Sequence, residues 1–135
     1  MSIHPWRRLR ELAHIELLWH DEGDAGVTDF EANTISLRRG MTHDERRSTI
    51  LHECLHVERG AVLETMTQKE ERRVEREAAR LLLPNIRAVG EALAWGRDLA
   101  ESAWELNVDE GTLYVRLTNL HPAERAYLKR RLEED

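Results

Sequence analysis

The segment from Thr42 to Gly60 carries the clearest helix boundaries in the chain. Thr42 and Glu45 form a Thr-x-x-Glu capping box, in which each side chain accepts a hydrogen bond from the other residue's backbone N–H group. Gly60 is typical of the residue after a helix, because glycine adopts positive φ without steric cost. We therefore predict a helix from about His43 to Arg59, and the rest of the fold has to pack around it.

Residues 52–56, inside this predicted helix, read His-Glu-Cys-Leu-His. Residues four apart lie on one helix face with their β-carbons about 5–6 Å apart, so His52 and His56 can bind one cation. At about 100° per residue, both histidines point away from the apolar residues Ile50 and Cys54. Histidines that only filled the core would lie among those residues, so the pattern indicates a metal site. Cys54 is expected to be a small buried residue and not a ligand.

A second helix is predicted to begin at Thr67 and to end at Leu83, because Thr67 and Glu70 repeat the capping-box pattern and Pro84 prevents continuation. Glu71 lies at the centre of the apolar stripe of this helix. Arginines occupy the opposite, solvent-facing side: Arg72, Arg73, Arg76 and Arg80.

A catalytic zinc site uses a third protein ligand and leaves its fourth position to water. Glu71 and Glu75, about 40° apart on the predicted apolar stripe, are the acidic candidates. Burying an unpaired carboxylate is costly, and metal coordination or a hydrogen bond from a ligating histidine offsets that cost. We assign Glu71 to the metal and Glu75 to the free N–H group of a ligating imidazole. The alternative, in which both glutamates pair with helix arginines and reach solvent, stays open.

Glu53 lies about 100° around the helix from His52, so its carboxylate can lie beside the water at the fourth position without binding the metal. Zinc lowers the pKa of such a water toward ~7, and a neighbouring carboxylate can take its proton and return it to a leaving amine. We therefore predict that Glu53 is a general base. The alternative is an exposed Glu53 that pairs with Arg46 or Arg47.

The remaining segments favour short strands before residue 42 and helices after residue 85. The expected elements are a helix over 6–13, extended chain over 14–20, strands over 27–30 and 34–37, and helices separated at 96, 107–109 and 121–122. This is an α+β, zincin-like pattern with a small sheet beside the metal-binding helix. We divide the chain into a metallopeptidase-like domain, residues 1–90, and a helical subdomain, residues 91–135, packed on it.

The strand over 34–37 directly precedes the metal-binding helix. We predict that it is an edge strand that receives an extended substrate by β-augmentation. The residues assigned to substrate binding are Thr34, Ile35, Ser36 and Leu37.

Residues 98–120 resemble a helix-turn-helix, with Asp98 and Asp109 as candidate caps of its two helices. Such a motif usually suggests DNA binding. Here the second helix would begin Asp109-Glu110-Gly111, and acidic residues at that end repel phosphates. We therefore favour a packing or substrate-docking role over DNA binding.

Composition limits the class of protein further. A chain of 135 residues normally forms one folding unit, and a net charge of −6 disfavours direct nucleic-acid binding, since phosphate contacts need surplus Lys and Arg. Cys54 is the only cysteine, so no intramolecular disulfide and no Cys-only zinc site can form. Because no apolar run approaches the ~20 residues that cross a bilayer and no signal peptide is evident, we expect a soluble, cytoplasmic protein with no membrane partner.

The two predicted helices resemble the ImmA/IrrE-type metallo-endopeptidases. The His52-Glu-x-x-His56 motif is followed by Glu71-x-x-Val-Glu75-x-Glu-Ala-Ala-Arg-Leu-Leu-Leu-Pro84, which is similar to the family's Glu-x-x-Ala-Asn-x-Phe-Ala-x-x-Leu-Leu-Met-Pro segment. In this register Glu71 takes the position of the zinc-binding glutamate. Glu75 and Glu77 depart from the usual asparagine and phenylalanine. The resemblance covers roughly residues 27–90.

The resemblance implies a zinc endopeptidase, with one Zn²⁺ per chain, that cleaves a helix-turn-helix transcriptional repressor of a phage or mobile element and so relieves repression. Candidates for stabilising the oxyanion are Tyr114, Tyr127 and His121. Two alternatives stay open. One is a non-enzymatic regulator with a structural zinc closed by four protein ligands, whose helical tail binds DNA or a repressor. The other is an antirepressor that acts by binding alone.

Overall fold

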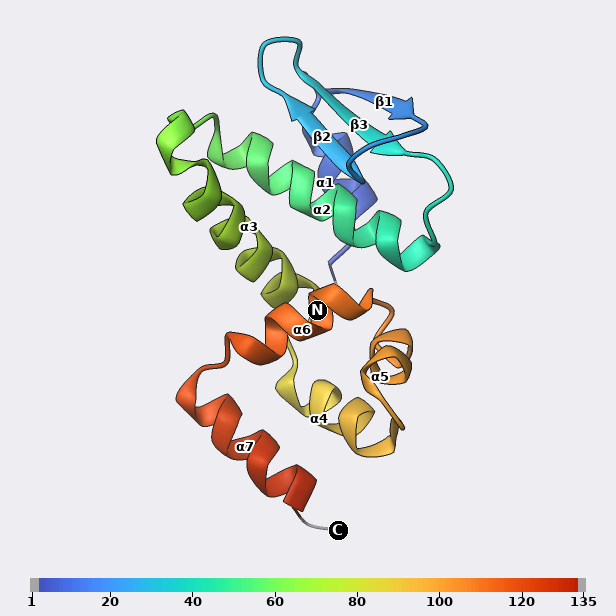
Figure 1. Ribbon diagram of the computed structural model, residues 1–135, viewed down its shortest axis with the longest axis vertical. Helices are drawn as coiled ribbons and strands as arrows, with labels where there is room; N and C mark the ends of the chain where they lie inside the picture. The colour runs from blue at the N-terminus through green and yellow to red at the C-terminus, as the bar shows by residue number, and fades with distance from the viewer. Residues whose placement is uncertain (1–2, 134–135) are drawn as a thin grey trace.

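The computed structural model describes residues 3–133, and its elements form an α+β fold. The sheet and α1 lie at one end of the molecule, α4, α5 and α7 lie at the other, and α2, α3 and α6 lie between them (Figure 1). In chain order the elements are α1 (Pro5–Glu11), β1 (Glu16–His20), β2 (Gly26–Asp29), β3 (Thr34–Arg38), α2 (His43–Arg59), the 3-10 turn η1 (Glu64–Met66), α3 (Thr67–Leu82), α4 (Ile86–Trp95), α5 (Leu99–Glu105), α6 (Glu110–Thr118) and α7 (Pro122–Glu133).

Helix α2 has the boundaries that its sequence predicts. The Thr42 hydroxyl accepts from the backbone N–H of Glu45 at 3.1 Å, and the Glu45 carboxylate accepts from that of Thr42 at 3.0 Å. Gly60 ends the helix with a φ of 86°. The capping box and the glycine together fix which residues of α2 lie on each face, and therefore where its histidines point.

One face of α2 packs on the sheet. Ile50 and Cys54 are fully buried in a core that they share with Ile35 and Leu37 of β3 and with Leu9 of α1. Cys54 is a free, buried thiol, and burial raises its pKa to about 12, so it stays protonated near neutral pH. This confirms that Cys54 is a core residue facing away from the histidines.

A second face of α2 packs on the helical part of the chain. Leu51 and Leu55 lie in a core with Val74 of α3, Val108 of the connection between α5 and α6, and Leu113 of α6. This core contains residues from both sides of position 90, so the two predicted units are packed together. The division at residue 90 itself stays a prediction.

The sheet has the order β1-β3-β2, with β1 parallel and β2 antiparallel to β3. The prediction that residues 34–37 form an edge strand is therefore wrong, because β3 is paired on both sides. Ile35 and Leu37 are buried on the core face of that central strand. β-propensity marks a buried central strand as well as an edge strand, which is why the sequence alone misplaced it. The strand that is both at an edge and next to α2 is β2.

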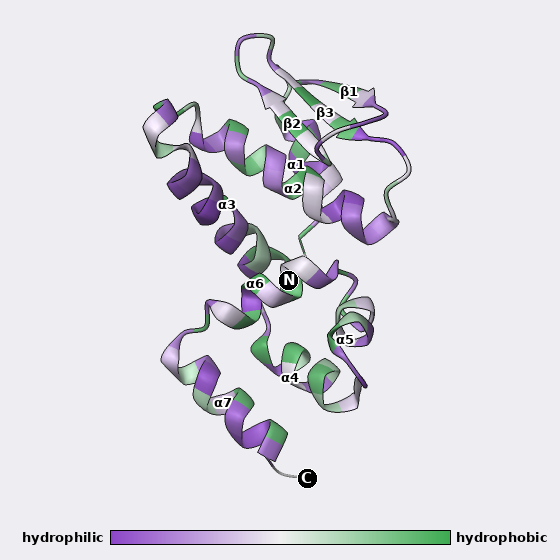
Figure 2. Ribbon diagram, viewed as in Figure 1, coloured by the Kyte–Doolittle hydropathy of each residue, from purple (hydrophilic) through white to green (hydrophobic). Residues whose placement is uncertain are grey.

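The predicted capping box at the start of α3 is also wrong. Thr67 is the first residue of the helix, Met66 precedes it in η1, and no side chain caps this end. The Glu70 carboxylate instead accepts two hydrogen bonds from the Arg59 guanidinium, at 2.7 and 2.8 Å, and Glu70 is buried. Most of α3 is strongly hydrophilic outside its apolar stripe, in contrast to α4 (Figure 2). Glu70 thus serves to join α3 to the end of α2.

The helices after residue 85 are separated near the predicted positions, which were 96, 107–109 and 121–122. Asn85 caps α4 by accepting from two backbone N–H groups, and Asp98 caps α5 by accepting from the N–H of Glu101. Asp109 precedes α6, but its carboxylate accepts from the Thr112 hydroxyl and from no backbone N–H. Within residues 3–133, no helix is long and apolar enough to cross a membrane.

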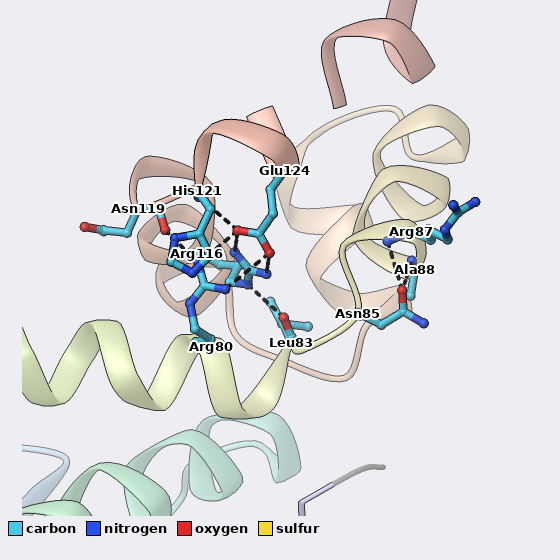
Figure 3. A network of polar contacts seen from close by, with 9 residues as sticks. All are labelled: Arg80, Leu83, Asn85, Arg87, Ala88, Arg116, Asn119, His121 and Glu124. Atoms are coloured by element: carbon cyan, nitrogen blue, oxygen red, sulfur yellow. Dashed lines mark hydrogen bonds and ion pairs between the residues drawn. The ribbon is translucent and has the colours of Figure 1, made fainter. Parts of the chain in front are cut away.

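A buried ion network holds the tail together (Figure 3). The Arg116 side chain is 1% exposed, donates to the carbonyl of Leu83 at 2.7 Å, and pairs with Glu124 at 2.6 Å. Arg80 of α3 pairs with the same carboxylate at 2.9 Å. Hydrogen bonds from Arg116 and Arg80 hold the pKa of Glu124 well below its usual range. Glu124 therefore connects α3, α6 and α7.

Replacing Glu124 with Gln leaves the buried Arg116 charge without its counterion. We expect Glu124→Gln to lower the free energy of unfolding by ~3 kcal/mol or more, measured by urea denaturation at pH 7. Glu101→Gln, which breaks the exposed pair of Arg97 and Glu101 on α5, is the matched control and should cost less than ~0.5 kcal/mol. Equal effects of the two changes would contradict a supporting role for the network.

Candidate metal centre

The third face of α2 carries both histidines into a cleft, where they meet Glu71 of α3. His52 Nε2 lies 2.6 Å from one Glu71 oxygen, and His56 Nε2 lies 2.8 Å from the other. The two Nε2 atoms are 3.2 Å apart. Among the His, Cys, Asp and Glu side chains of residues 3–133, these three lie close enough together to hold a metal ion. Their ligand atoms all lie within 4.8 Å of one another.

The donor set fits a zinc-sized cation. With Zn–N distances near ~2.1 Å, two ligand atoms of a tetrahedral site lie ~3.4 Å apart. The two Nε2 atoms are close to that separation, whereas the Glu71 oxygens lie at hydrogen-bonding distance from them. Burial lowers the pKa of His52, so the imidazole is neutral near pH 7, which is the form that binds metals. The arrangement is therefore compatible with a metal site of three protein ligands.

Glu53 lies beside this site and is nearly inaccessible to solvent, with 5% of its surface exposed. Burial raises its pKa to about 7, and the nearby negative charge of Glu71 adds to the effect. Its Oε2 atom accepts from the Thr28 hydroxyl of β2 at 3.5 Å. The alternative of an exposed Glu53 paired with Arg46 or Arg47 is therefore wrong. A carboxylate with a pKa near neutrality is suited to accepting a proton.

Glu75 does not lie where the apolar stripe predicted. It is exposed, and it makes no hydrogen bond to either histidine within the described part of the chain. Its side chain is on the wall of the cleft, close enough to His52 for an electrostatic interaction. Neither Glu71 nor Glu75 pairs with an arginine, in the residues that the structure describes. The buried carboxylate of α3 is Glu70.

The cleft has a volume of about 1010 Å³ and lies between β2, α2, α3 and the start of α6. Of the three oxyanion candidates, Tyr114 lines this cleft, whereas Tyr127 stacks under Arg87 and His121 lies beside Glu124. The lining includes six carboxylate residues and no Lys or Arg: Asp24, Glu53, Glu70, Glu71, Glu75 and Asp109. Acidic walls disfavour a nucleic-acid backbone as the occupant.

Two walls of this cleft, β2 and α6, were not predicted from the sequence. Gly26 and Thr28 of β2 approach Glu53, and the hydroxyls of Thr112 in α6 and Ser48 in α2 are hydrogen-bonded at 3.2 Å. Strand order and the docking of α6 depend on contacts between residues far apart in the chain. The one local signal is Gly26, because glycine inside a strand marks a close approach of another element.

The buried Glu53 should oppose folding of the metal-free protein at high pH. Because folding raises the pKa from 4.5 to about 7, the penalty is absent below pH 4.5 and complete above pH 7. We expect metal-free Glu53→Gln to gain up to ~3 kcal/mol in unfolding free energy relative to the original chain between pH 4.5 and 8. Denaturant titrations across that range measure it, with the exposed change Glu105→Gln as control. A difference that does not vary with pH would contradict the burial argument.

The two candidate carboxylates of α3 can be separated by metal binding. We expect Glu71→Ala to lose most of its affinity for zinc, because one of three protein ligands is gone. Glu75→Ala should keep stoichiometric zinc, with a loss below the ~10–100-fold typical of residues that hydrogen-bond to a ligand. Zinc per chain and competition with a chelator of known affinity measure both. If Glu75→Ala loses its zinc and Glu71→Ala retains it, the roles must be exchanged.

Comparison with known proteins gives one match. No curated protein and no solved structure matches the chain significantly. The family model of the IrrE N-terminal-like domain, a peptidase family, matches residues 18–118. That range runs from β1 to the end of α6, so it includes every wall of the cleft and all three members of the metal cluster. The chain therefore belongs to the peptidase family of the IrrE N-terminal-like domain.

Proposed function

We propose that this peptidase is a zinc-dependent endopeptidase with His52, His56 and Glu71 as ligands of one Zn²⁺ and Glu53 as general base. The observation that carries the proposal is a three-ligand cluster open to a cleft, with a buried carboxylate of raised pKa beside it. A zinc site that is closed by four protein ligands is structural, whereas a catalytic site leaves one position free. The three-member cluster favours the enzyme over the regulator with a structural zinc.

The chain's own groups would divide the chemistry as follows. A zinc ion held by His52, His56 and Glu71 would supply Lewis acidity toward a water molecule and the substrate carbonyl. Glu53 takes a proton from the attacking water and delivers it to the leaving amine. Its proton affinity near neutral pH suits both transfers. Tyr114 is the candidate for donating a hydrogen bond to the oxyanion, since it is the member of the three candidates that lines the cleft.

An extended peptide would bind along β2. This strand pairs with β3 on one side only, and Val27 and Thr28 line the cleft beside the metal cluster. The cleft runs along α2 from Ser48 to Gly60, which at 1.5 Å per residue is ~18 Å. At ~3.3 Å per residue, about five residues of an extended chain fit that length. β2 thus replaces residues 34–37 as the strand that receives substrate by β-augmentation.

The substrate we propose is a helix-turn-helix transcriptional repressor, on the basis of the family resemblance. Neither acidic walls nor the position of α6 favours DNA as the ligand. The start of α6, with Asp109 and Thr112, faces the cleft and is hydrogen-bonded to α2, so it is not free to enter a major groove. The helical tail then acts as a wall of the substrate cleft.

The decisive experiment is incubation of the zinc-loaded protein with the repressor encoded beside its gene, followed by intact-mass analysis. We expect two fragments whose masses sum to that of the repressor plus one water. Glu53→Gln should bind zinc normally and cleave at least ~10²-fold more slowly, because an amide cannot accept the water's proton. Tyr114→Phe should lower kcat with little change in KM if its hydroxyl contacts the oxyanion.

The outcomes separate the alternatives. A repressor that is bound tightly but left intact indicates an antirepressor that acts by binding alone. Equal cleavage by Glu53→Gln and the original chain would remove Glu53 from the mechanism. Cleavage that continues after complete chelation would show that the reaction does not need the metal.

A further inference from the structure

Gly26 of β2 lies against Thr49 and Glu53 of α2. A β-carbon added at Gly26 would lie 2.6 Å from Thr49 Cγ2, 2.8 Å from Glu53 Cγ and 3.1 Å from Glu53 Cδ. Contacts below 3.0 Å are not tolerated by carbon atoms, so any side chain at residue 26 has to displace a neighbour. The space that a β-carbon would take is occupied by Thr49 and by the Glu53 side chain.

Backbone conformation gives no reason for a glycine here. The glycines of the described chain that have positive φ are Gly23, Gly40 and Gly60, and Gly26 is not among them. Gly26 is paired with Leu37 in the β2–β3 ladder, where alanine could adopt the same extended backbone. Glycine weakens a strand, because it loses more conformational freedom on folding than other residues. The requirement at this position is therefore one of space.

The neighbours of Gly26 differ in how easily they can move. The backbone at residue 26 is held by the ladder and by the adjacent hydrogen bond from the Arg38 N–H to the Ala25 carbonyl at 2.9 Å. Thr49 is β-branched on a helix and has few rotamers, and its hydroxyl lies 3.7 Å from Met41 Sδ. The Glu53 side chain has more torsional freedom, so it is the group that a side chain at residue 26 would push aside.

Thr28 acts on Glu53 from the same strand. Residues two apart on a strand point to the same face, so Gly26 and Thr28 both face α2. Thr28 donates its hydroxyl to Glu53 Oε2 at 3.5 Å, while Gly26 leaves room for Glu53 Cγ and Cδ. In β2, the hydroxyl of Thr28 thus contacts the Glu53 carboxylate, and the absence of a side chain at Gly26 leaves the space that Glu53 occupies. The two residues together define where this carboxylate lies.

We propose that Gly26 is a positioning residue for the general base: its missing side chain keeps Glu53 between β2 and α2, at the distance from the metal cluster that proton transfer needs. This inference rests on the proposed function for the role of Glu53. It adds that the strand that receives the substrate also sets the position of the base. A small displacement of a reacting group is enough to matter, since ~1 Å can cost ~10²-fold in rate.

The test compares Gly26→Ala with Gly90→Ala. A β-carbon at Gly90 of α4 would also crowd its neighbours, with Tyr127 Cε2 at 3.0 Å and Leu128 Cδ2 at 3.3 Å, but Gly90 does not line the cleft. We expect Gly26→Ala to bind zinc stoichiometrically, to keep KM within about threefold and to lose ~10²-fold in kcat. Gly90→Ala should keep the kcat of the original chain.

A double variant separates positioning from general damage to the fold. Gly26→Ala/Thr49→Ser removes the Cγ2 atom of the 2.6 Å clash and keeps the hydroxyl near Met41, but it leaves the clash with Glu53. We expect it to recover melting temperature relative to Gly26→Ala without recovering kcat. Parallel recovery of both quantities would overturn the proposal, because the loss of activity would then follow from lower stability.

Crystal structures of the zinc-loaded original chain and of Gly26→Ala provide a readout that does not depend on turnover. We expect the Glu53 carboxylate to be displaced and the positions of His52, His56 and Glu71 to be unchanged. An unmoved Glu53 would overturn the proposal even if kcat fell. If the original chain cleaves no protein substrate, the proposed function fails, while the position of Glu53 in the two structures still decides the role of Gly26.

Discussion

The packing of α2 on three sides is the constraint on which the rest of the structure depends. No residue from 44 to 57 is exposed, since one face meets the sheet, a second meets the helical core and the third lines the cleft. At about 100° per residue, Ile50 and Cys54, then Leu51 and Leu55, and then the two histidines fall on these faces in turn. Any shift in helix register would move the histidines into a core, so correct folding and assembly of the metal site are one event.

Several features of the candidate metal site lower the stability of the metal-free protein. Glu53 is buried beside Glu71, burial lowers the pKa of His52, and β2 carries a glycine where alanine would make a stronger strand. Each of these features opposes folding of the metal-free chain, and each suits a catalytic site that a bound cation completes. The network around Glu124 and the paired Arg59 and Glu70 lie outside the reacting groups and stabilise the helices that carry them.

The helical tail owes its function to where it is anchored. Arg47 donates to the carbonyl of Asn107 at 2.7 Å, and the hydroxyls of Thr112 and Ser48 are hydrogen-bonded, so α2 holds the start of α6 directly. Leu113 and Arg116 on the inner side of α6 are buried, while Tyr114 remains exposed on the cleft side. The helix-turn-helix-like segment thus forms packed helices, of which α6 lines the cleft.

The sequence by itself determined the limits of α2 and the faces of its residues, because capping and helical periodicity are local properties. The sequence also predicted that Glu71 meets His52 and His56, but that meeting depends on how α3 packs against α2, which only the tertiary structure shows. Only the tertiary structure decided that β3 is central and β2 is the edge, since strand order follows from pairing between distant segments that leaves no local pattern. It also decided that Glu70, not Glu75, is the buried carboxylate, because Arg59 from another helix supplies the partner that makes burial tolerable. Burial and strand order depend on neighbours far along the chain, and the periodicity of one segment does not contain them.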